Sequence, residues 1–170
     1  KGMTHRVDFT YGVLGYAYLR KGEHEKAGAA FTRYVDLSPK KAYPLNCLGE
    51  YCLIVGDYDR ALKVLKQALE IEPDSPLAHA SLGDTYLAKG MCAEAQRSYE
   101  RYLALSPGQS RKADAHFLLG KLNYLKGDYA GAAQECRQAS ELDPTMPEAH
   151  WILGLSLIKQ GMFRQADAET

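Results

Sequence analysis

Five Leu-Gly pairs recur along this chain at an almost constant interval. Successive pairs are 34, 34, 37 and 34 residues apart, with their glycines at Gly15, Gly49, Gly83, Gly120 and Gly154. A period of roughly 20–50 residues is typical of repeat architectures, in which each unit is one small supersecondary structure that stacks on its neighbours. The spacing therefore argues against an ordinary globular fold before any single residue is considered.

Each Leu-Gly pair is followed by small residues and breakers in the same order. A second glycine comes seven residues later, an alanine comes twelve residues later, and a proline stands 24 residues after each of the first four glycines. The second glycine suits a helix end, where the backbone turns left-handed without a Cβ penalty. The proline lacks the N–H that a continuing helix needs. Each repeat is therefore predicted to be a helix, a short turn, a second helix and a stop.

The first helix of each repeat carries apolar or small residues on one face. In the first repeat these follow the i, i+3, i+4, i+7 pattern of a buried stripe, at Tyr11, Leu14, Gly15 and Tyr18. A glycine in mid-helix costs about 1 kcal/mol relative to alanine, so its repetition predicts close approach of a second helix. In the fourth repeat Asn123 and Cys136 replace the aromatic residues of other repeats, which predicts looser packing there.

The order of leucine-glycine, tyrosine, glycine, alanine, aromatic residue, alanine and proline resembles the tetratricopeptide repeat family, whose repeats are helical hairpins of about 34 residues. The resemblance covers Asp8 to Thr170. It implies an all-α fold, a right-handed superhelical α-solenoid of such hairpins, in a single array over residues 1–170. The predicted repeats are 8–41, 42–75, 76–109 and 113–146, with an incomplete repeat at 147–170.

Two irregularities interrupt this predicted array. The extra residues Ser110, Arg111 and Lys112 account for the 37-residue interval, and we expect them to lengthen the connection between the third and fourth repeats. The sequence stops within the second helix of a repeat, whereas solenoids usually finish with a polar capping helix. We therefore expect a fragment of a longer protein, or a protein with further repeats.

The composition limits the classes of partner and the cellular compartments that we expect. Basic and acidic residues number 21 each, so no overall positive field favours nucleic acid. No apolar run approaches the roughly 18 residues of a membrane span, so no membrane insertion is expected. The cysteines show no repeated spacing, and Cys47 and Cys52 fall on different faces of one helix, a poor arrangement for a disulfide. Free core cysteines favour a reducing compartment, so a cytoplasmic location is preferred to a periplasmic one.

Catalytic and metal-binding patterns are missing from the sequence. No phosphate-binding loop or spaced nucleophile and base is present, so we predict no enzyme activity, no catalytic residues and no cofactor. His79, His116 and His150 occupy equivalent places in different repeats. Packed helices lie roughly 8–10 Å apart, too far for these histidines to share a metal ion bound at about 2 Å. We expect them to pack rather than to bind metal.

A second stripe lies on the first helices, opposite the core stripe. The resemblance implies that this face lines a concave groove that holds a peptide or helix of a partner protein. An apolar second face demands such an explanation, because surface helices usually place charge there. The predicted groove residues are Tyr16, Tyr43, Asn46, Glu50, Asp84, Phe117, Lys121, Tyr124, Trp151 and Leu155. The alternatives are that further C-terminal helices or a second copy of the chain cover this face, or that Trp151 packs between repeats.

One subtype of the family holds acidic C-terminal tails through a carboxylate clamp that begins with a lysine three residues before the glycine. Gly12 stands there in the first repeat and Asn46 in the second, so the cation is missing. We predict a noncatalytic protein–protein interaction scaffold that binds its partner in the groove without this clamp. Two alternatives stay open: a regulatory or substrate-presenting arm of a larger enzyme, or a module that forms homo-oligomers through its uncapped C-terminal end.

Overall fold

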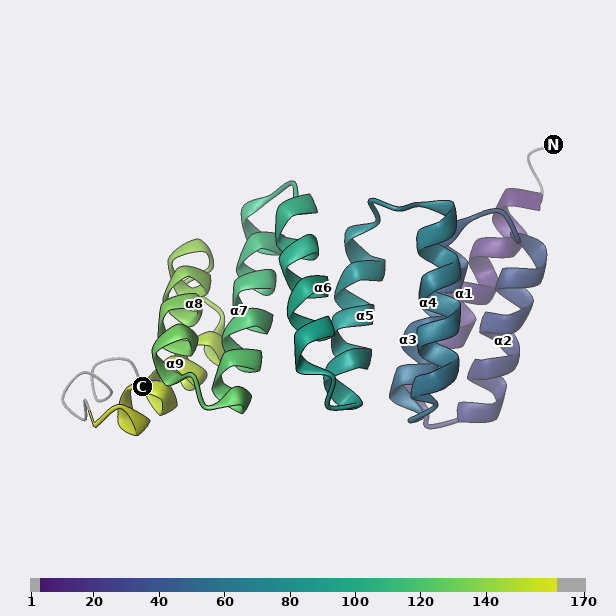
Figure 1. Ribbon diagram of the computed structural model, residues 1–170. Helices are drawn as coiled ribbons and strands as arrows, with labels where there is room; N and C mark the ends of the chain where they lie inside the picture. The colour runs from purple at the N-terminus through teal and green to yellow at the C-terminus, as the bar shows by residue number, and fades with distance from the viewer. Residues whose placement is uncertain (1–3, 162–170) are drawn as a thin grey trace. The chain divides into compact units, whose positions relative to one another are not determined.

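The structure is a computed structural model that describes residues 4–161, with side chains described from residue 9 onward. These residues form α-helices joined by short turns, without a strand among them (Figure 1). The chain divides into two compact parts, which we call the N-terminal block (Lys1–Lys89) and the C-terminal block (Gly90–Thr170). The predicted all-α class of paired helices is confirmed.

The N-terminal block contains five helices: α1 (Thr4–Arg20), α2 (His24–Leu37), α3 (Ala42–Ile54), α4 (Tyr58–Ile71) and α5 (Pro76–Ala88). Helix α1 pairs with α2 and α3 pairs with α4, while α5 packs against both α3 and α4. Phe31 of α2 and Leu65 of α4 are fully buried. The second helices of the hairpins thus provide the large core side chains, and the first helices pack on them.

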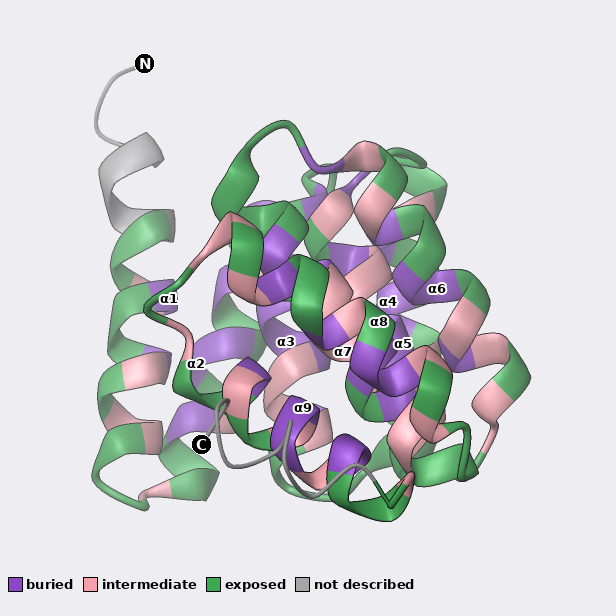
Figure 2. Ribbon diagram, turned by 90° about the vertical axis from the view of Figure 1, so that its left-hand side faces the viewer, coloured by how far each residue is buried: buried purple, intermediate pink, exposed green. Residues whose placement is uncertain are grey.

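The C-terminal block contains α6 (Cys92–Leu105), α7 (Gln109–Lys126), α8 (Tyr129–Leu142) and α9 (Pro147–Lys159). Helix α7 pairs with α8 and also contacts α6, and α9 packs against both α7 and α8. Cys136, Leu153 and Leu157 are buried together between α8 and α9. In both blocks buried and exposed residues alternate along the helices, as Figure 2 shows, which is the pattern of amphipathic helices.

The predicted helix ends are confirmed at the turn glycines. Gly22, Gly56, Gly90, Gly127 and Gly161 all have positive φ, between 73° and 81°. At Gly56 this left-handed conformation lets the N–H of Asp57 donate to the carbonyl oxygen of Cys52 at 2.9 Å, which closes the end of α3. The predicted stops are confirmed as well, because α2, α4, α6 and α8 each end two residues before a proline.

The predicted close approach at the mid-helix glycines is confirmed at Gly15, Gly49 and Gly120. A Cβ on Gly49 would lie 2.5 Å from Cγ of Leu65, and one on Gly120 would lie 2.5 Å from Sγ of Cys136. The latter Cβ would also lie 3.3 Å from two backbone atoms of α8. Cys136 is fully buried. The expected looser packing is therefore not found here, because the small cysteine lets the backbones of α7 and α8 come close.

The three extra residues of the 37-residue interval correct one prediction. Ser110, Arg111 and Lys112 lie in the first turn of α7 rather than in a longer connection. Helix α7 consequently has 18 residues, whereas α3, α5 and α9 have 13. These residues are tolerated or favoured in helices, and no glycine or proline stands between Gly108 and Gly120 to prevent helix formation. The single array over residues 1–170 stays a prediction, and residues 162–170 lie outside the described part of the chain.

Candidate functional site

The ten predicted groove residues fall into one set in each block. Helices α1, α3 and α5 of the N-terminal block carry the first set: Tyr16, Tyr43, Asn46, Glu50 and Asp84. Helices α7 and α9 of the C-terminal block carry the second: Phe117, Lys121, Tyr124, Trp151 and Leu155. Each set is a candidate site within its own block.

The first site is a polar cluster around the carboxylate of Glu50 on α3. The hydroxyl of Tyr16 on α1 donates to Oε2 at 2.6 Å, and Nδ2 of Asn46 donates to Oε1 at 2.8 Å. The hydroxyl of Ser81 on α5 donates to Oε1 at the longer distance of 3.3 Å. Glu50 therefore links the first helices of three successive repeats. Ser81 is a member that the sequence pattern does not distinguish from other small polar residues on the same stripe.

Asn46 of this cluster is almost completely buried, with 2% of its surface exposed. Its Nδ2 binds Glu50, but its Oδ1 is buried without a hydrogen-bond partner. Leaving a buried acceptor unsatisfied costs about 1–3 kcal/mol. The polar cluster thus keeps one unused acceptor.

Two tyrosines and a thiol in the cluster are held in their neutral forms. Burial and the hydrogen bond to Glu50 raise the pKa of Tyr16 well above its ordinary value. The nearby Cys47 thiol, followed by burial, raises the pKa of Tyr43 to about 12, and burial raises the pKa of Cys47 itself. Tyr43 keeps 47% of its surface exposed. Of these aromatic residues it is the one that a partner can reach directly.

The raised pKa of Tyr16 predicts a specific loss of stability in alkali. A group whose pKa is raised by folding stabilises the fold fully below its unfolded pKa, and this contribution is lost as the pH rises above it. We expect the denaturation midpoint to fall as the pH rises from about 9 to about 11, and Tyr16→Phe to flatten this fall. Urea titrations at each pH measure it, with the exposed Tyr58→Phe as control. An equally steep fall in Tyr16→Phe would contradict the assignment.

The second site is an apolar pocket of about 570 Å³ between α7 and α9. Four of the five predicted residues line it, while Leu155 does not. The full lining is Phe117, Lys121, Tyr124, Leu125, Pro147, Glu148, Trp151 and Ile152. Most of the additional lining residues stand one helical turn from a predicted residue. The i, i+4 spacing of a helix could therefore have identified them from the sequence.

The pocket combines exposed apolar surface with opposite charges. Trp151 is 61% exposed and Leu125 is 60% exposed. The ring of Tyr124 lies 5.4 Å from that of Tyr129 in a T-shaped arrangement, which holds one wall in place. Lys121 on α7 and Glu148 on α9 are exposed among the lining residues. A pocket of this size and polarity accommodates one or two large apolar side chains or a small ligand.

Two of the three equivalent histidines bind the end of the preceding repeat. Nε2 of His79 lies 3.0 Å from the carbonyl oxygen of Pro73, and Nε2 of His150 lies 3.1 Å from that of Pro144. Since a carbonyl only accepts, the imidazole N–H donates in both cases. These bonds give His79 and His150 the packing role predicted for them.

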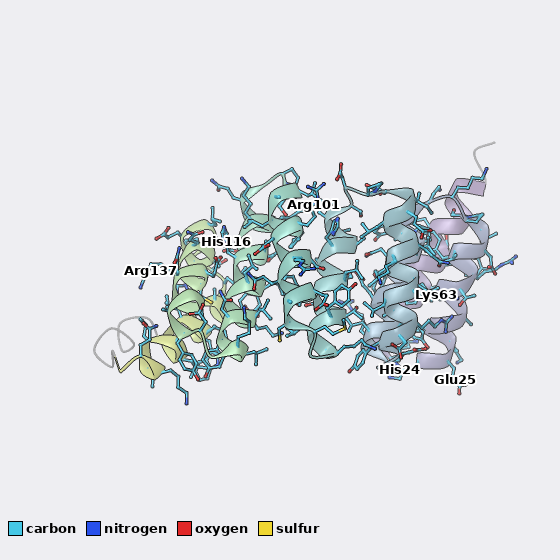
Figure 3. All side chains as sticks on the ribbon, viewed as in Figure 1. His24, Glu25, Lys63, Arg101, His116 and Arg137 are labelled. Atoms are coloured by element: carbon cyan, nitrogen blue, oxygen red, sulfur yellow. The ribbon has the colours of Figure 1, made fainter. Side chains whose placement is uncertain are left out.

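His116 packs differently, between α7 and α8 (Figure 3), where its Nδ1 lies 2.8 Å from Oε2 of Glu135. His24 is exposed at the start of α2. Within residues 9–161 no three histidine, cysteine, aspartate or glutamate side chains are grouped in a way that could hold a metal ion. All four cysteines are free, and none of the described helices is long and apolar enough to cross a membrane.

Comparisons with known proteins agree with this architecture. Family models described as tetratricopeptide repeat match residues 10–41 and 82–147, and one described as TPR repeat matches 54–90. Anaphase-promoting complex subunit 3 of Schizosaccharomyces pombe is 29% identical, over 66% of this chain and 16% of its own length. BBSome complex member BBS4 of Bos taurus is 26% identical, over 92% of this chain and 31% of its own length.

A solved structure of pilF from Pseudomonas aeruginosa has the same fold, with a TM-score of 0.89 and 17% identity. The match covers 99% of this chain and 75% of that one. The curated relatives are much longer than this chain, which spans between 7% and 16% of the first two. These similarities therefore support the repeat fold. They do not transfer the partners of any relative to this chain.

Proposed function

Because this chain belongs to the tetratricopeptide repeat family, we propose that it is a noncatalytic module that binds a peptide or helix of a partner protein. Proteins of this family are generally interaction scaffolds, and two relatives are by name members of protein complexes. The proposal places partner segments against the first helices, with the polar cluster of one block and the apolar pocket of the other as separate sites. Binding requires preorganised shape and apolar contact, and no bond of the partner is broken.

The observation that carries this proposal is the α7/α9 pocket with its exposed tryptophan. Most of the lining is apolar or aromatic, and Trp151 exposes more than half of its surface there. Tryptophan and tyrosine are enriched among the few interface residues that supply most of the binding free energy. Lys121 and Glu148 lie in the same pocket and can contact polar groups beside an apolar side chain. The pocket also lacks the set of cations that a carboxylate clamp requires.

Trp151 is the sole tryptophan of the chain, so its fluorescence reports on this pocket. Peptides selected from a random library on the immobilised protein would be titrated while emission and acrylamide quenching are recorded. We expect a shift of the emission to shorter wavelength and weaker quenching, and no change with peptides whose apolar residues are replaced by serine. Selected peptides that bind without altering Trp151 would remove the pocket from the proposal. A change caused by raising the protein concentration alone would indicate self-association instead.

A further inference from the structure

The polar cluster of the N-terminal block has an imbalance between donors and acceptors. Three of its side-chain donors point to one acceptor, since Tyr16, Asn46 and Ser81 each donate to Glu50. A carboxylate offers about four acceptor positions, so one is left over. The buried Oδ1 of Asn46 is a second unused acceptor beside it. The cluster can therefore accept further hydrogen bonds but has few to give.

The charges on the same face are mainly negative, so they favour the same kind of partner group as the excess of acceptors does. Glu50 and Asp84, both partly buried, occupy equivalent positions on α3 and α5. Tyr16 and Cys47 stay neutral because burial raises the pKa of each, so neither adds a negative charge beside Glu50. The basic residue on this stripe within the block is Arg20, which is exposed at the last position of α1. Charge complementarity thus favours a cationic group with several N–H donors.

We propose that the polar cluster binds a lysine side chain of the partner segment, whose ammonium donates to Oδ1 of Asn46 and to the carboxylate of Glu50. This rests on the proposed function and specifies the chemistry of the partner. Lysine fits better than arginine, because a guanidinium pairs best with two free oxygens of one carboxylate. Both oxygens of Glu50 already accept hydrogen bonds, whereas a compact ammonium can reach separate acceptors.

Access to the acceptor requires a small movement, because Oδ1 is covered in the structure. The hydroxyl of Ser81 makes the longest bond to Glu50, at 3.3 Å. It is therefore the group that rotates away when the ammonium enters. The exposed ring of Tyr43 lies one turn before Cys47 and provides apolar surface for the lysine stem.

The test uses nuclear magnetic resonance with an acetylated and amidated pentapeptide, Gly-Gly-Lys-Gly-Gly, at roughly millimolar concentration. Asn46 and Asn123 are the two asparagines of the chain, so the side-chain amide of Asn123 on α7 is an internal control. We expect the Asn46 amide resonances to shift with the lysine peptide, less with its arginine counterpart, and not with the norleucine counterpart. An unmoved Asn46, or an equal shift with norleucine, would overturn the proposal.

Two variants keep the test independent of folding. In Asn46→Leu, which keeps the side-chain size, the shift of the Ser81 backbone amide should fall about fivefold or more, while the midpoint of thermal unfolding stays within roughly 5 °C. In Ser81→Ala the hydroxyl that competes for Oε1 of Glu50 is gone, so the lysine peptide should bind a few times more tightly. Weaker binding to Ser81→Ala would count against the proposed entry. Failure here with an intact Trp151 response would reject the lysine and leave the binding function standing.

Discussion

Replacing Phe31 by alanine is expected to destabilise the protein by about 3–5 kcal/mol. Phe31 is fully buried on α2. Its ring lies edge-on to Tyr16 of α1 with centroids 5.0 Å apart, and 5.8 Å from the ring of Tyr51 on α3. A Cβ on Gly15 would lie 2.6 Å from the same ring. Removal of the ring therefore leaves a cavity that three helices line, and the polar cluster loses the support beneath Tyr16.

Chemical denaturation followed by circular dichroism measures this loss. The matched control is Leu37→Ala, which removes an apolar side chain from the same helix at a position that is 39% exposed, and it should cost less than about 1 kcal/mol. A cost below about 1 kcal/mol for Phe31→Ala would mean that α1 and α3 close over the cavity. Equal costs for the two variants would contradict the assignment of Phe31 to the core.

The sequence was sufficient for those parts of the fold that depend on the backbone. A left-handed residue such as Gly56 and a stopping proline act locally, so their meaning does not depend on the neighbours. The tight contact of Gly49 with Leu65 could be predicted, because a mid-helix glycine destabilises the helix unless close packing offsets that cost. The extra residues before Ala113 were misassigned, because the length of an interval does not tell whether a loop or a helix grows. Their lack of glycine and proline was the better signal.

The fourth repeat shows what a pattern of side-chain sizes cannot predict. Replacement of an aromatic residue by Cys136 suggested a loss of packing, yet the thiol is completely buried and a Cβ on Gly120 would lie 2.5 Å from it. That outcome depends on how far the two backbones can move together, which is a property of the whole hairpin. The size of one residue therefore predicted how much side-chain volume is lost, but not how the helix backbones adjust to that loss.

The candidate sites were predictable as helix faces but not as sets of contacts. Phe117, Tyr124 and Trp151 meet in one pocket because seven residues are about two helical turns and α9 repeats the register of α7. The bond from Tyr16 to Glu50 joins residues one period apart, and it was accessible to the same reasoning. Convergence of three donors on Glu50, and the orphan oxygen of Asn46, depend on side-chain rotamers. No periodicity specifies those.

Trp151→Ala is expected to weaken the binding of a pocket-directed peptide about 30-fold or more, equivalent to about 2 kcal/mol. The indole supplies much of the exposed apolar surface of the pocket, and its burial by a partner is lost in the variant. Stability should change by less than about 0.5 kcal/mol, because Trp151 is 61% exposed and contributes little to the core. Fluorescence anisotropy of a labelled peptide from the library selection measures the affinity, and urea denaturation measures the stability.

Ile158→Ala provides the matched control for this substitution. Ile158 lies on the same helix, is 39% exposed and does not line the pocket, so its removal should change peptide affinity by less than about twofold. Unchanged affinity in Trp151→Ala would exclude the pocket as the binding site. A large loss of stability together with the loss of affinity would instead make Trp151 a packing residue, the alternative that its place in the repeat also permits. Loss of affinity at unchanged stability, confined to Trp151, is the result that only a binding role explains.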